Sequence, residues 1–359
     1  MEKQTPLYEK HLEANGTIVP FAGYLLPVQY PTGIIAEHLA VRQHAGIFDV
    51  SHMGEILLSG KDAEQNLNYL LTNNFTGMPD GSCRYSLMLY PDGGQVDDLI
   101  VYRLDESRFF VVLNAANTVK DIDWIAGHLT GECVLTDLSQ RTAQIALQGP
   151  DSRKIIASLC DETALPKKYY SFTPSMTVAG AVCLVSRTGY TGEFGYELYM
   201  APEDAPKVWD ALKAEGAVPC GLGCRDTLRL EAAMPLYGHE LGETVNPVGA
   251  GLSFAIKAEK TDFIGKEALL TMGEPKRLRV GLKVTGRGII REHETVWKDG
   301  KEVGVTTSGT HCPSLGGAYA MAYLDREFCP TGTEVTVIVR GREITAEVVP
   351  LPFYKRTQV

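Results

Sequence analysis

The chain lacks the features that mark metal-bound and membrane-spanning proteins. Its eight cysteines are scattered and none forms a C-x-x-C pair, which disfavours a zinc or iron–sulfur site, so we expect no metal. No apolar run approaches the roughly 20 residues that a membrane-spanning helix needs. The first residues resemble neither a signal peptide nor a transit peptide. We therefore expect a cytoplasmic protein without a membrane partner.

Positive charge and cofactor signatures are also scarce. The chain has 34 Lys and Arg residues against 44 Asp and Glu residues, and this net charge of −10 disfavours a nucleic-acid partner. It contains neither a Walker A loop nor a GxGxxG fingerprint after a strand, so phosphate and dinucleotide cofactors are not expected. The histidines belong to no recognisable nucleophile signature and do not support acid–base catalysis by imidazole.

The length and the order of elements predict the domain organisation. A chain of 359 residues is too long for one small core and predicts two or three domains. Hairpins outnumber βαβ units over residues 1–275, which predicts an α+β fold of two related, intertwined subdomains with antiparallel sheets. Residues 276–359 show short alternating strands between Gly-rich turns, as in a small β-barrel or sandwich. We place the border near residues 273–277.

Residue patterns predict the individual elements. Thr5 is expected to cap a first helix, with Pro6 at the first helical position. The segment 19–30 is too apolar for a solvent-exposed loop and too proline-rich for a central strand. Further helices are expected over 33–43, 62–71, 118–129, 150–159 and 202–215. Strands are expected over 46–58, 108–114, 134–135, 142–148, 181–187 and 195–200, and then over 279–284, 294–297, 304–308, 317–324, 334–339 and 344–349.

Residues 85–102 predict a β-hairpin with two adjacent aspartates. Two apolar runs flank Pro91-Asp-Gly-Gly, and the second run begins with Asp97 and Asp98. Because strand residues alternate between faces, Asp97 lies on the face of Leu99 and Val101, and Asp98 on the face of Ile100 and Tyr102. A buried carboxylate is costly unless it is paired, so the hairpin indicates a site. The alternative is a hydrated aspartate at the start of the strand.

A second informative stretch runs from Arg187 to Tyr199. Its glycines permit tight turns, and Glu197 lies in a strand between aromatic and aliphatic residues. Glu197 could bind a ligand, or it could form a cross-strand ion pair on an exposed face.

A third stretch contains two arginines four residues apart, Arg225 and Arg229, which share one helical face. Each could form an internal ion pair with Asp226 or Glu231, and for either arginine alone this is the favoured interpretation. Alternatively, one of them holds a ligand carboxylate in bidentate fashion.

Together these stretches resemble the T-protein family of the glycine cleavage system over nearly the whole chain. The matching motifs in the first half are Thr5-Pro-Leu-Tyr, Val19-Pro-Phe-Ala-Gly-Tyr, Pro27-Val-Gln-Tyr, Phe48-Asp-Val-Ser-His-Met-Gly-Glu and the hairpin 85–102. Those in the second half are Leu147-Gln-Gly-Pro, the stretch 187–199, Gly221-Leu-Gly-Cys-Arg-Asp-Thr-Leu-Arg-Leu-Glu, Asp262-Phe-Ile-Gly-Lys-Glu, Thr307-Ser-Gly-Thr and Pro352-Phe-Tyr-Lys-Arg.

The resemblance implies a three-domain, cloverleaf-like enzyme around a central channel. It would be an aminomethyltransferase that moves the one-carbon unit from the lipoyl arm of H-protein to tetrahydrofolate, releasing ammonia. Asp98 matches the catalytic aspartate of the family, and Glu197 suits the adjacent N–H donors of a pterin ring. The other residues expected to bind folate are Tyr85, Tyr102 and Tyr190 as flat walls, Arg225, Tyr354 and Arg356 toward the anionic glutamate tail, and Asn114 and Tyr237.

Two other functions stay open at this point. A folate-dependent demethylase of the same superfamily would share the pterin slot, and a non-catalytic folate-binding protein would have no need for Asp98. The H-protein partner comes from the resemblance. One local feature supports it, because residues 276–301 carry eight basic and three acidic side chains, 8 − 3 = +5 in an acidic chain. The same stretch could equally be the solvated rim of a β-domain.

Overall fold

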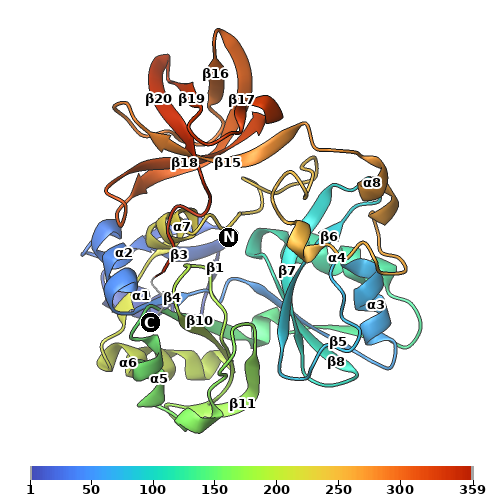
Figure 1. Cartoon of the computed structure of the whole chain (residues 1–359). Helices are drawn as coiled ribbons and strands as arrows, with labels where there is room; N and C mark the ends of the chain where they lie inside the picture. Colours follow the sequence, from blue (N-terminus) through green and yellow to red (C-terminus); the bar gives the residue numbers. More distant parts are fainter. Residues whose placement is uncertain (1, 357–359) are drawn as a thin grey trace.

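The hairpin with the two aspartates forms as predicted in the computed structural model, which describes residues 2–356 (Figure 1). It consists of β6 (Cys83–Leu89) and β7 (Gln95–Arg103), with Asp98 opposite Leu87 and Asp97 opposite Met88. These strands begin a five-stranded sheet of order β6-β7-β8-β5-β9, completed by β8 (Arg108–Leu113), β5 (Gly54–Ser59) and β9 (Val134–Asp137). Helices α3 (Ala63–Leu70) and α4 (Thr118–His128) contribute to the same core as Leu99 and Val101.

A second sheet repeats this strand order. It runs β11-β12-β13-β10-β4-β14 and consists of β11 (Phe172–Val178), β12 (Ala181–Ser186), β13 (Gly195–Met200), β10 (Ala143–Gln148), β4 (Gly46–Asp49) and β14 (Val218–Pro219). In each sheet three consecutive strands are followed by the strand that precedes them in the chain. Helices α5 (Ser152–Ala157) and α6 (Ala205–Ala214) share the core of this sheet. The shared order supports the predicted relation between the two subdomains.

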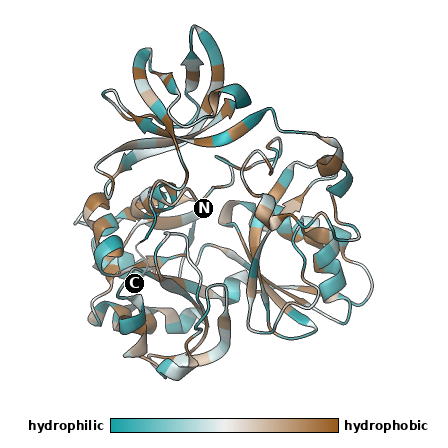
Figure 2. Cartoon of the chain, in the orientation of Figure 1, coloured by the Kyte–Doolittle hydropathy of each residue, from teal (hydrophilic) through white to brown (hydrophobic). Residues whose placement is uncertain are grey.

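The C-terminal strands close into a six-stranded barrel of order β15-β18-β17-β16-β19-β20. Its strands are β15 (Arg277–Val284), β16 (Thr295–Lys298), β17 (Lys301–Cys312), β18 (Gly317–Asp325), β19 (Glu334–Val339) and β20 (Arg342–Val349). Hydrophobic and hydrophilic residues alternate along them, as expected for a barrel with an apolar interior (Figure 2). The barrel prediction is confirmed, although β17 extends well beyond the predicted 304–308.

Three predictions about the N-terminal region are wrong, two of them about strands. The run 46–58 is not one strand, because residues 50–53 break it into β4 and β5, which belong to different sheets. The proline-rich segment forms β2 (Thr17–Phe21) and β3 (Tyr24–Gln29), and β3 is the central strand of a small sheet with β1 (Lys3–Gln4). Pro27 is tolerated there because β1 pairs only with Tyr24 and Leu25, so no neighbour needs an N–H from Pro27 on that side.

Thr5 does not cap the first helix. Helix α1 (Tyr8–Glu13) begins three residues later, and its cap residue makes no side-chain hydrogen bond. The Thr5 hydroxyl instead donates to Asp49 Oδ2 at 2.6 Å, and His11 Nε2 lies 2.8 Å from the same oxygen. These buried contacts attach the N-terminal segment to the end of β4.

Helix α7 (Leu222–Glu231) lies between the second sheet and the barrel. It packs against α2 (Ile34–Gln43), β3 and the barrel strand β17 at the centre of Figure 1. Its residues Cys224 and Leu228 share a core with Phe48 and Ala146 of the second sheet. A short helix, α8 (Lys266–Thr271), precedes the barrel. None of the helices in residues 2–356 combines the length and apolarity that a membrane crossing requires.

Candidate active site

Asp98 lies on β7 with its carboxyl group held by two donors. The Tyr85 hydroxyl donates to Oδ2 at 3.0 Å, and Asn114 Nδ2 donates to Oδ1 at 2.9 Å. The side chain is partly exposed. Burial, followed by the charge of Asp97, raises the pKa of Asp98 to about 7, while the two hydrogen bonds oppose this rise. Asp98 is thus a carboxyl group that changes its protonation state near neutral pH.

Asp97 points to the opposite face and is fully buried. Asn114 Nδ2 and Asn117 Nδ2 both donate to its Oδ1 at 2.9 Å. The same Asn114 amide therefore contacts both aspartates. The alternative of a hydrated aspartate at the strand's start is wrong, because β7 begins at Gln95 and both carboxyl groups are hydrogen bonded within the fold.

One aromatic side chain, Tyr85, contacts the Asp98 carboxyl, and a second, Phe254, packs on Tyr85. The Tyr85 ring stacks on Phe254 with centroids 5.9 Å apart, and Phe254 is 64% exposed. The Tyr190 hydroxyl donates to the carbonyl oxygen of Pro235 at 2.5 Å. Burial raises the pKa of Tyr190, and the nearby charge of Asp98 contributes to the rise. Tyr85 contacts the Asp98 carboxyl directly, whereas the Tyr190 hydroxyl bonds to Pro235 and its ring faces Arg225.

Glu197 lies on β13 and is 7% exposed, so an ion pair on an exposed face is excluded. Its carboxyl accepts hydrogen bonds from Gln144 Nε2 at 3.1 Å and from the Thr188 hydroxyl. Burial raises the pKa of Glu197, while these hydrogen bonds and the charge of Arg225 lower it. Gly195 leaves room for Gln148, whose Nε2 donates to the carbonyl oxygen of Thr188 at 3.2 Å, because a Cβ at this position would lie 2.3 Å from that nitrogen.

The two arginines of α7 have different roles. Arg229 forms the internal ion pairs, at 2.8 Å to Asp226 and 2.8 Å to Glu240, and it also donates to Ser308. Glu240, rather than the expected Glu231, is its buried partner. Arg225 forms no ion pair among the described residues, and its Nη1 has no hydrogen-bond partner there. Its guanidinium lies 4.9 Å from the centre of the Tyr190 ring, which leaves it available for an anionic ligand.

A cavity of about 380 Å³ opens beside Arg225, between the second subdomain and the barrel. Its walls come from β2, the residues after β4, α7 and β17. The lining residues are Phe21, His52, Tyr190, Leu222, Arg225, Asp226, Arg229, Leu236, His239, Arg291, Glu292, Ser308 and Gly309. The volume is in the range of small-molecule sites. Of the predicted site residues, Tyr190 and Arg225 line it directly.

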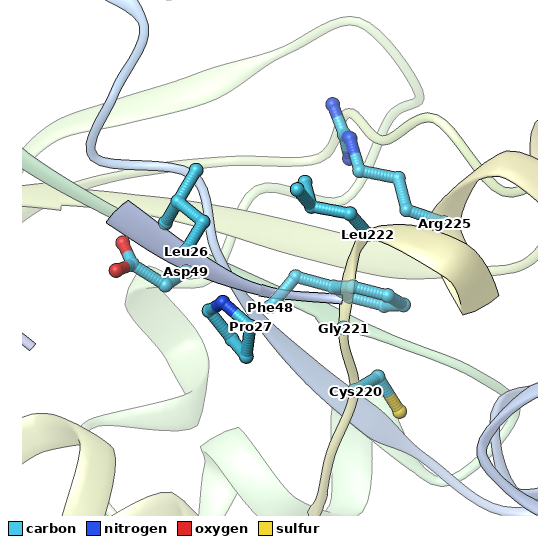
Figure 3. A pocket seen from close by; sticks show the side chains of 8 residues that line it. All are labelled: Leu26, Pro27, Phe48, Asp49, Cys220, Gly221, Leu222 and Arg225. Carbon is cyan, nitrogen blue, oxygen red and sulfur yellow. The ribbon is translucent and has the colours of Figure 1, made fainter. Parts of the chain in front are cut away.

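A second cavity, behind the first turn of α7, is too small for a ligand. It encloses about 10 Å³, room for a water molecule at most, and its lining includes Asp49, Cys220 and Arg225. Figure 3 shows the Arg225 side chain projecting from α7 on the side away from Cys220.

The C-terminal tail brings two predicted residues to the second subdomain. The guanidinium of Arg356 lies 4.0 Å from the Phe194 ring centre and 5.9 Å from that of Tyr169. The Tyr354 ring lies 3.9 Å from the Arg42 guanidinium. Burial, followed by a hydrogen bond to Glu193, raises the pKa of Tyr354 to about 12. Both side chains are partly exposed near the Glu197 strand and the loop before it.

Three predicted folate contacts make their hydrogen bonds within the fold. Tyr102 is 0% exposed, so the expectation that it forms a ligand wall is wrong; its hydroxyl lies 2.9 Å from that of Tyr199 within the core. It reaches Glu197 indirectly, through Thr188 at 3.4 Å. Tyr237 donates to the carbonyl oxygen of Gln95 at 2.9 Å and lies on the Asp97 side of β7. Asn114, which was also expected to bind folate, donates to the carboxyl groups of Asp97 and Asp98.

The sequence interpretation missed several polar residues of the site. His52 follows β4 and lines the cavity, and burial lowers its pKa to about 4, so it is neutral at pH 7. Gln144, Thr188 and Asn117 bind the acidic groups described above. Nothing in the local sequence distinguishes these residues from ordinary strand and loop residues, because their partners lie on other elements.

One cluster in the described residues has the composition of a metal site. Glu37, Cys220 and Cys224 bring their ligand atoms together in the interior. Both Glu37 oxygens, however, already accept backbone N–H groups, from Tyr30 at 2.6 Å and from Gly221 at 2.9 Å. The carboxylate therefore serves to join the two segments.

Comparisons with known proteins agree with this arrangement. Residues 7–260 match the family model described as the GCVT N-terminal domain, and residues 277–355 match the glycine cleavage T-protein C-terminal barrel domain. Proteins named aminomethyltransferase are 45% identical over 358 residues in Listeria monocytogenes, covering 99% of both chains, and 45% identical over 366 residues in Geobacillus kaustophilus, covering 100% of both.

A solved structure gives the same result. The glycine cleavage system aminomethyltransferase T from Bartonella henselae is 35% identical to this chain, covers 99% of both chains and superposes with a TM-score of 0.91. Two family models and full-length relatives thus account for both the α+β region and the barrel. The chain belongs to the glycine cleavage T-protein family.

Proposed function

We propose that the protein is a tetrahydrofolate-dependent aminomethyltransferase that acts in the cytoplasm on the lipoylated H-protein. The reaction converts the aminomethyl group on the lipoyl arm and tetrahydrofolate into methylenetetrahydrofolate, ammonia and the dihydrolipoyl arm. The observation that carries this proposal is the partly exposed Asp98 carboxyl, held by Tyr85 and Asn114. Its relatives' names supply the reaction class.

Glu197 is the proposed anchor for the pterin ring. Its carboxyl is buried beside the charge of Arg225, and Thr188 and Gln144 fix its orientation. A pterin presents adjacent N–H donors, which a fixed carboxylate can accept together. The glutamate tail of folate is anionic and suits Arg225, whose Nη1 lacks a partner, with Arg356 and Tyr354 as further contacts. These residues would fix the substrate relative to Asp98.

Asp98 is the proposed catalytic group. Its carboxylate would lie near the folate nitrogens that receive the carbon, orient the attacking amine and stabilise the positive charge of the developing iminium. The carbon–nitrogen bond of the aminomethyl group breaks and the nitrogen leaves as ammonia, and the carbon–sulfur bond breaks and leaves the lipoyl arm as a thiol. The carbon forms bonds to two folate nitrogens, whose two N–H protons end on the ammonia and on the thiol. A carboxylate in a site that excludes much of the water stabilises such a cation more strongly than it would in bulk solvent.

The pH dependence of turnover tests the state of Asp98. If the ionised form is required, kcat/KM for tetrahydrofolate should rise with pH through an acid limb at about 7, because the pKa of Asp98 in the free protein is raised to about 7 and kcat/KM reports the free enzyme. A normal aspartate would place that limb at about 3.9. The measurement is kcat/KM for ammonia release from pH 5.5 to 8.5. A flat profile over this range would contradict the assignment.

Charge on the barrel supports an acidic protein partner. Five of the eight basic residues in 276–301 are exposed, and one of these, Arg291, also borders the cavity; the five are Lys276, Lys283, Arg287, Arg291 and Lys301. Such a surface would attract an acidic partner and orient its approach toward the cavity. We propose this side as the approach of H-protein.

The direct test is ammonia release from aminomethylated H-protein with and without tetrahydrofolate. We expect release that depends on tetrahydrofolate, with methylenetetrahydrofolate formed in equal amount. Folate binding without ammonia would instead favour a demethylase of the same superfamily or a non-catalytic folate-binding protein. A demethylase would convert a methylated donor in the same assay, and a binding protein would convert neither substrate.

A further inference from the structure

A third acidic side chain, Asp121, lies behind Asp97. It is in the first turn of α4 and is 0% exposed. Within residues 2–356, neither of its oxygens has a conventional hydrogen-bond donor, and the second oxygen of Asp97, Oδ2, lacks one too. Buried carboxyl oxygens without donors are costly and rare in folded proteins. The pair therefore requires a physical explanation.

A proton shared between Asp97 and Asp121 explains how both carboxyl groups can be buried together. Asn117 donates to Asp97 Oδ1 at 2.9 Å and lies four residues before Asp121, on the same face at the start of α4, so the Asp121 carboxyl is directed toward Asp97 as well. Ionised carboxylates only accept hydrogen bonds, so one member must be protonated for the contact to be favourable. Asp97 already accepts two amide donors at Oδ1, which stabilise its charged form, whereas Asp121 has no such donors. The proton therefore belongs to Asp121.

The surrounding charges agree with this placement. Burial, followed by the hydrogen bond and the charge of Asp97, raises the pKa of Asp121 to about 10, while Lys120 opposes the rise. Lys120 Nζ donates hydrogen bonds to the Val96 carbonyl oxygen and the Tyr237 hydroxyl. The other titratable groups near the pair are Asp98 on β7, Tyr90 at the end of the hairpin, and Tyr237 and Glu243 in the segment after α7.

The pair is linked to the reacting carboxyl through one amide. Asn114 Nδ2 donates at 2.9 Å both to Asp97 Oδ1 and to Asp98 Oδ1. We propose that Asp121 is a positioning residue for the transfer: as a neutral acid it donates to Asp97, and Asp97 and Asn114 then fix the Asp98 carboxylate. This inference rests on the proposed function. Asp121 itself touches neither substrate nor reacting atoms.

Three variants separate this role from a general effect on the fold. Asp121→Asn keeps a donor toward Asp97 and cannot ionise. Asp121→Leu has a similar size but removes the donor. Asp123→Asn makes the same chemical change at an exposed position of α4 and serves as the matched control. Each is assayed as the full-length protein with aminomethylated H-protein.

We expect Asp121→Asn and Asp123→Asn to keep kcat within about threefold of the wild type, since the hydrogen bonds to Asp97 and Asp98 persist. The acid limb of their kcat/KM profile should also stay where it is in the wild type. Asp121→Leu should lose at least about tenfold in kcat with an unchanged KM for tetrahydrofolate, because a charge-assisted hydrogen bond behind Asp98 is lost. A folded Asp121→Leu variant with wild-type kcat would overturn the inference.

Infrared spectroscopy provides a second measurement that does not need turnover. At pH 8 the wild-type protein should show carbonyl stretches of buried protonated carboxyl groups, at higher frequency than the carboxylate bands. Glu55, which is fully buried and whose pKa is raised by burial, contributes to this region in every variant. The difference spectrum of wild type minus Asp121→Asn should therefore show one such band and that of wild type minus Asp123→Asn should show none, even if Asp121→Leu fails to fold. Absence of a band from the first difference spectrum would refute the neutral acid. Absence of ammonia release by the wild type would instead overturn the proposed function, and with it the role in transfer.

Discussion

Replacement of Asp98 by asparagine is expected to lower kcat for ammonia release by at least about 100-fold, the typical loss when a preorganised electrostatic or acid–base group is removed. The amide has nearly the same shape, so it can still contact Tyr85 and Asn114, which hold the native carboxyl at 3.0 and 2.9 Å. What it loses is the negative charge opposite the developing iminium. Steady-state kinetics with aminomethylated H-protein measure this loss.

The same variant should fold and melt at an equal or higher temperature at pH 8. Burial raises the folded-state pKa of Asp98 to about 7, so the folded protein binds this proton more tightly than the unfolded chain does. Stability from Asp98 therefore falls as pH rises from about 4 to about 7, and the ionised carboxylate is a net cost above that range. Asparagine removes the cost. A clear drop in melting temperature at pH 8 would indicate a structural role instead.

Asp97→Asn is the internal control and should lose less than about tenfold in kcat. Its amide oxygen can still accept from Asn114 and Asn117, and its amide nitrogen can donate to Asp121, which would then carry the charge. The network behind Asp98 is thereby kept. Equal losses in Asp97→Asn and Asp98→Asn would contradict the assignment of Asp98 as the catalytic group.

Local periodicity was sufficient for much of this fold. Alternation along a strand separates Asp97 from Asp98, and the structure places Leu99 and Val101 in the core under α3 and α4, with Tyr102 in a different core on the opposite face. The barrel followed from regular spacing of short strands. These features depend on neighbours in sequence, so the sequence carries them directly.

Features set by distant partners were not predictable in this way. Arg225 and Arg229 share a helical face, and the sequence offers Asp226 to either one. The structure pairs Arg229 with Asp226 and also with Glu240, which lies outside the helix and could not be assigned from local spacing. Tyr102 has the composition of a binding-site residue, but contact between the two sheets buries it completely. Asp121 looked like an ordinary helical aspartate, because its partner lies on another element. Such roles arise from tertiary packing, which a single sequence does not encode locally.

Replacement of Glu197 by glutamine should weaken tetrahydrofolate binding by at least about tenfold. One carboxylate oxygen becomes an NH₂ donor, which would face the N–H donors of the pterin and leave one of them unpaired. Gln144 and Thr188 can still bind the new side chain, because the Thr188 hydroxyl can accept as well as donate. Loss of charge-assisted bonding worth roughly 1.5–3 kcal/mol corresponds to about 10- to 100-fold in Kd.

Isothermal titration with tetrahydrofolate measures this effect directly. Glu203→Gln, an exposed change just after β13, is the matched control and should bind folate as the wild type does. At saturating folate, Glu197→Gln should recover more of its turnover than Asp98→Asn can, because the first variant loses substrate binding and the second loses charge at the reacting atoms. Unchanged folate affinity in Glu197→Gln would show that the pterin binds elsewhere, and the buried carboxyl would then serve only the Thr188–Gln144 network between β10 and β13.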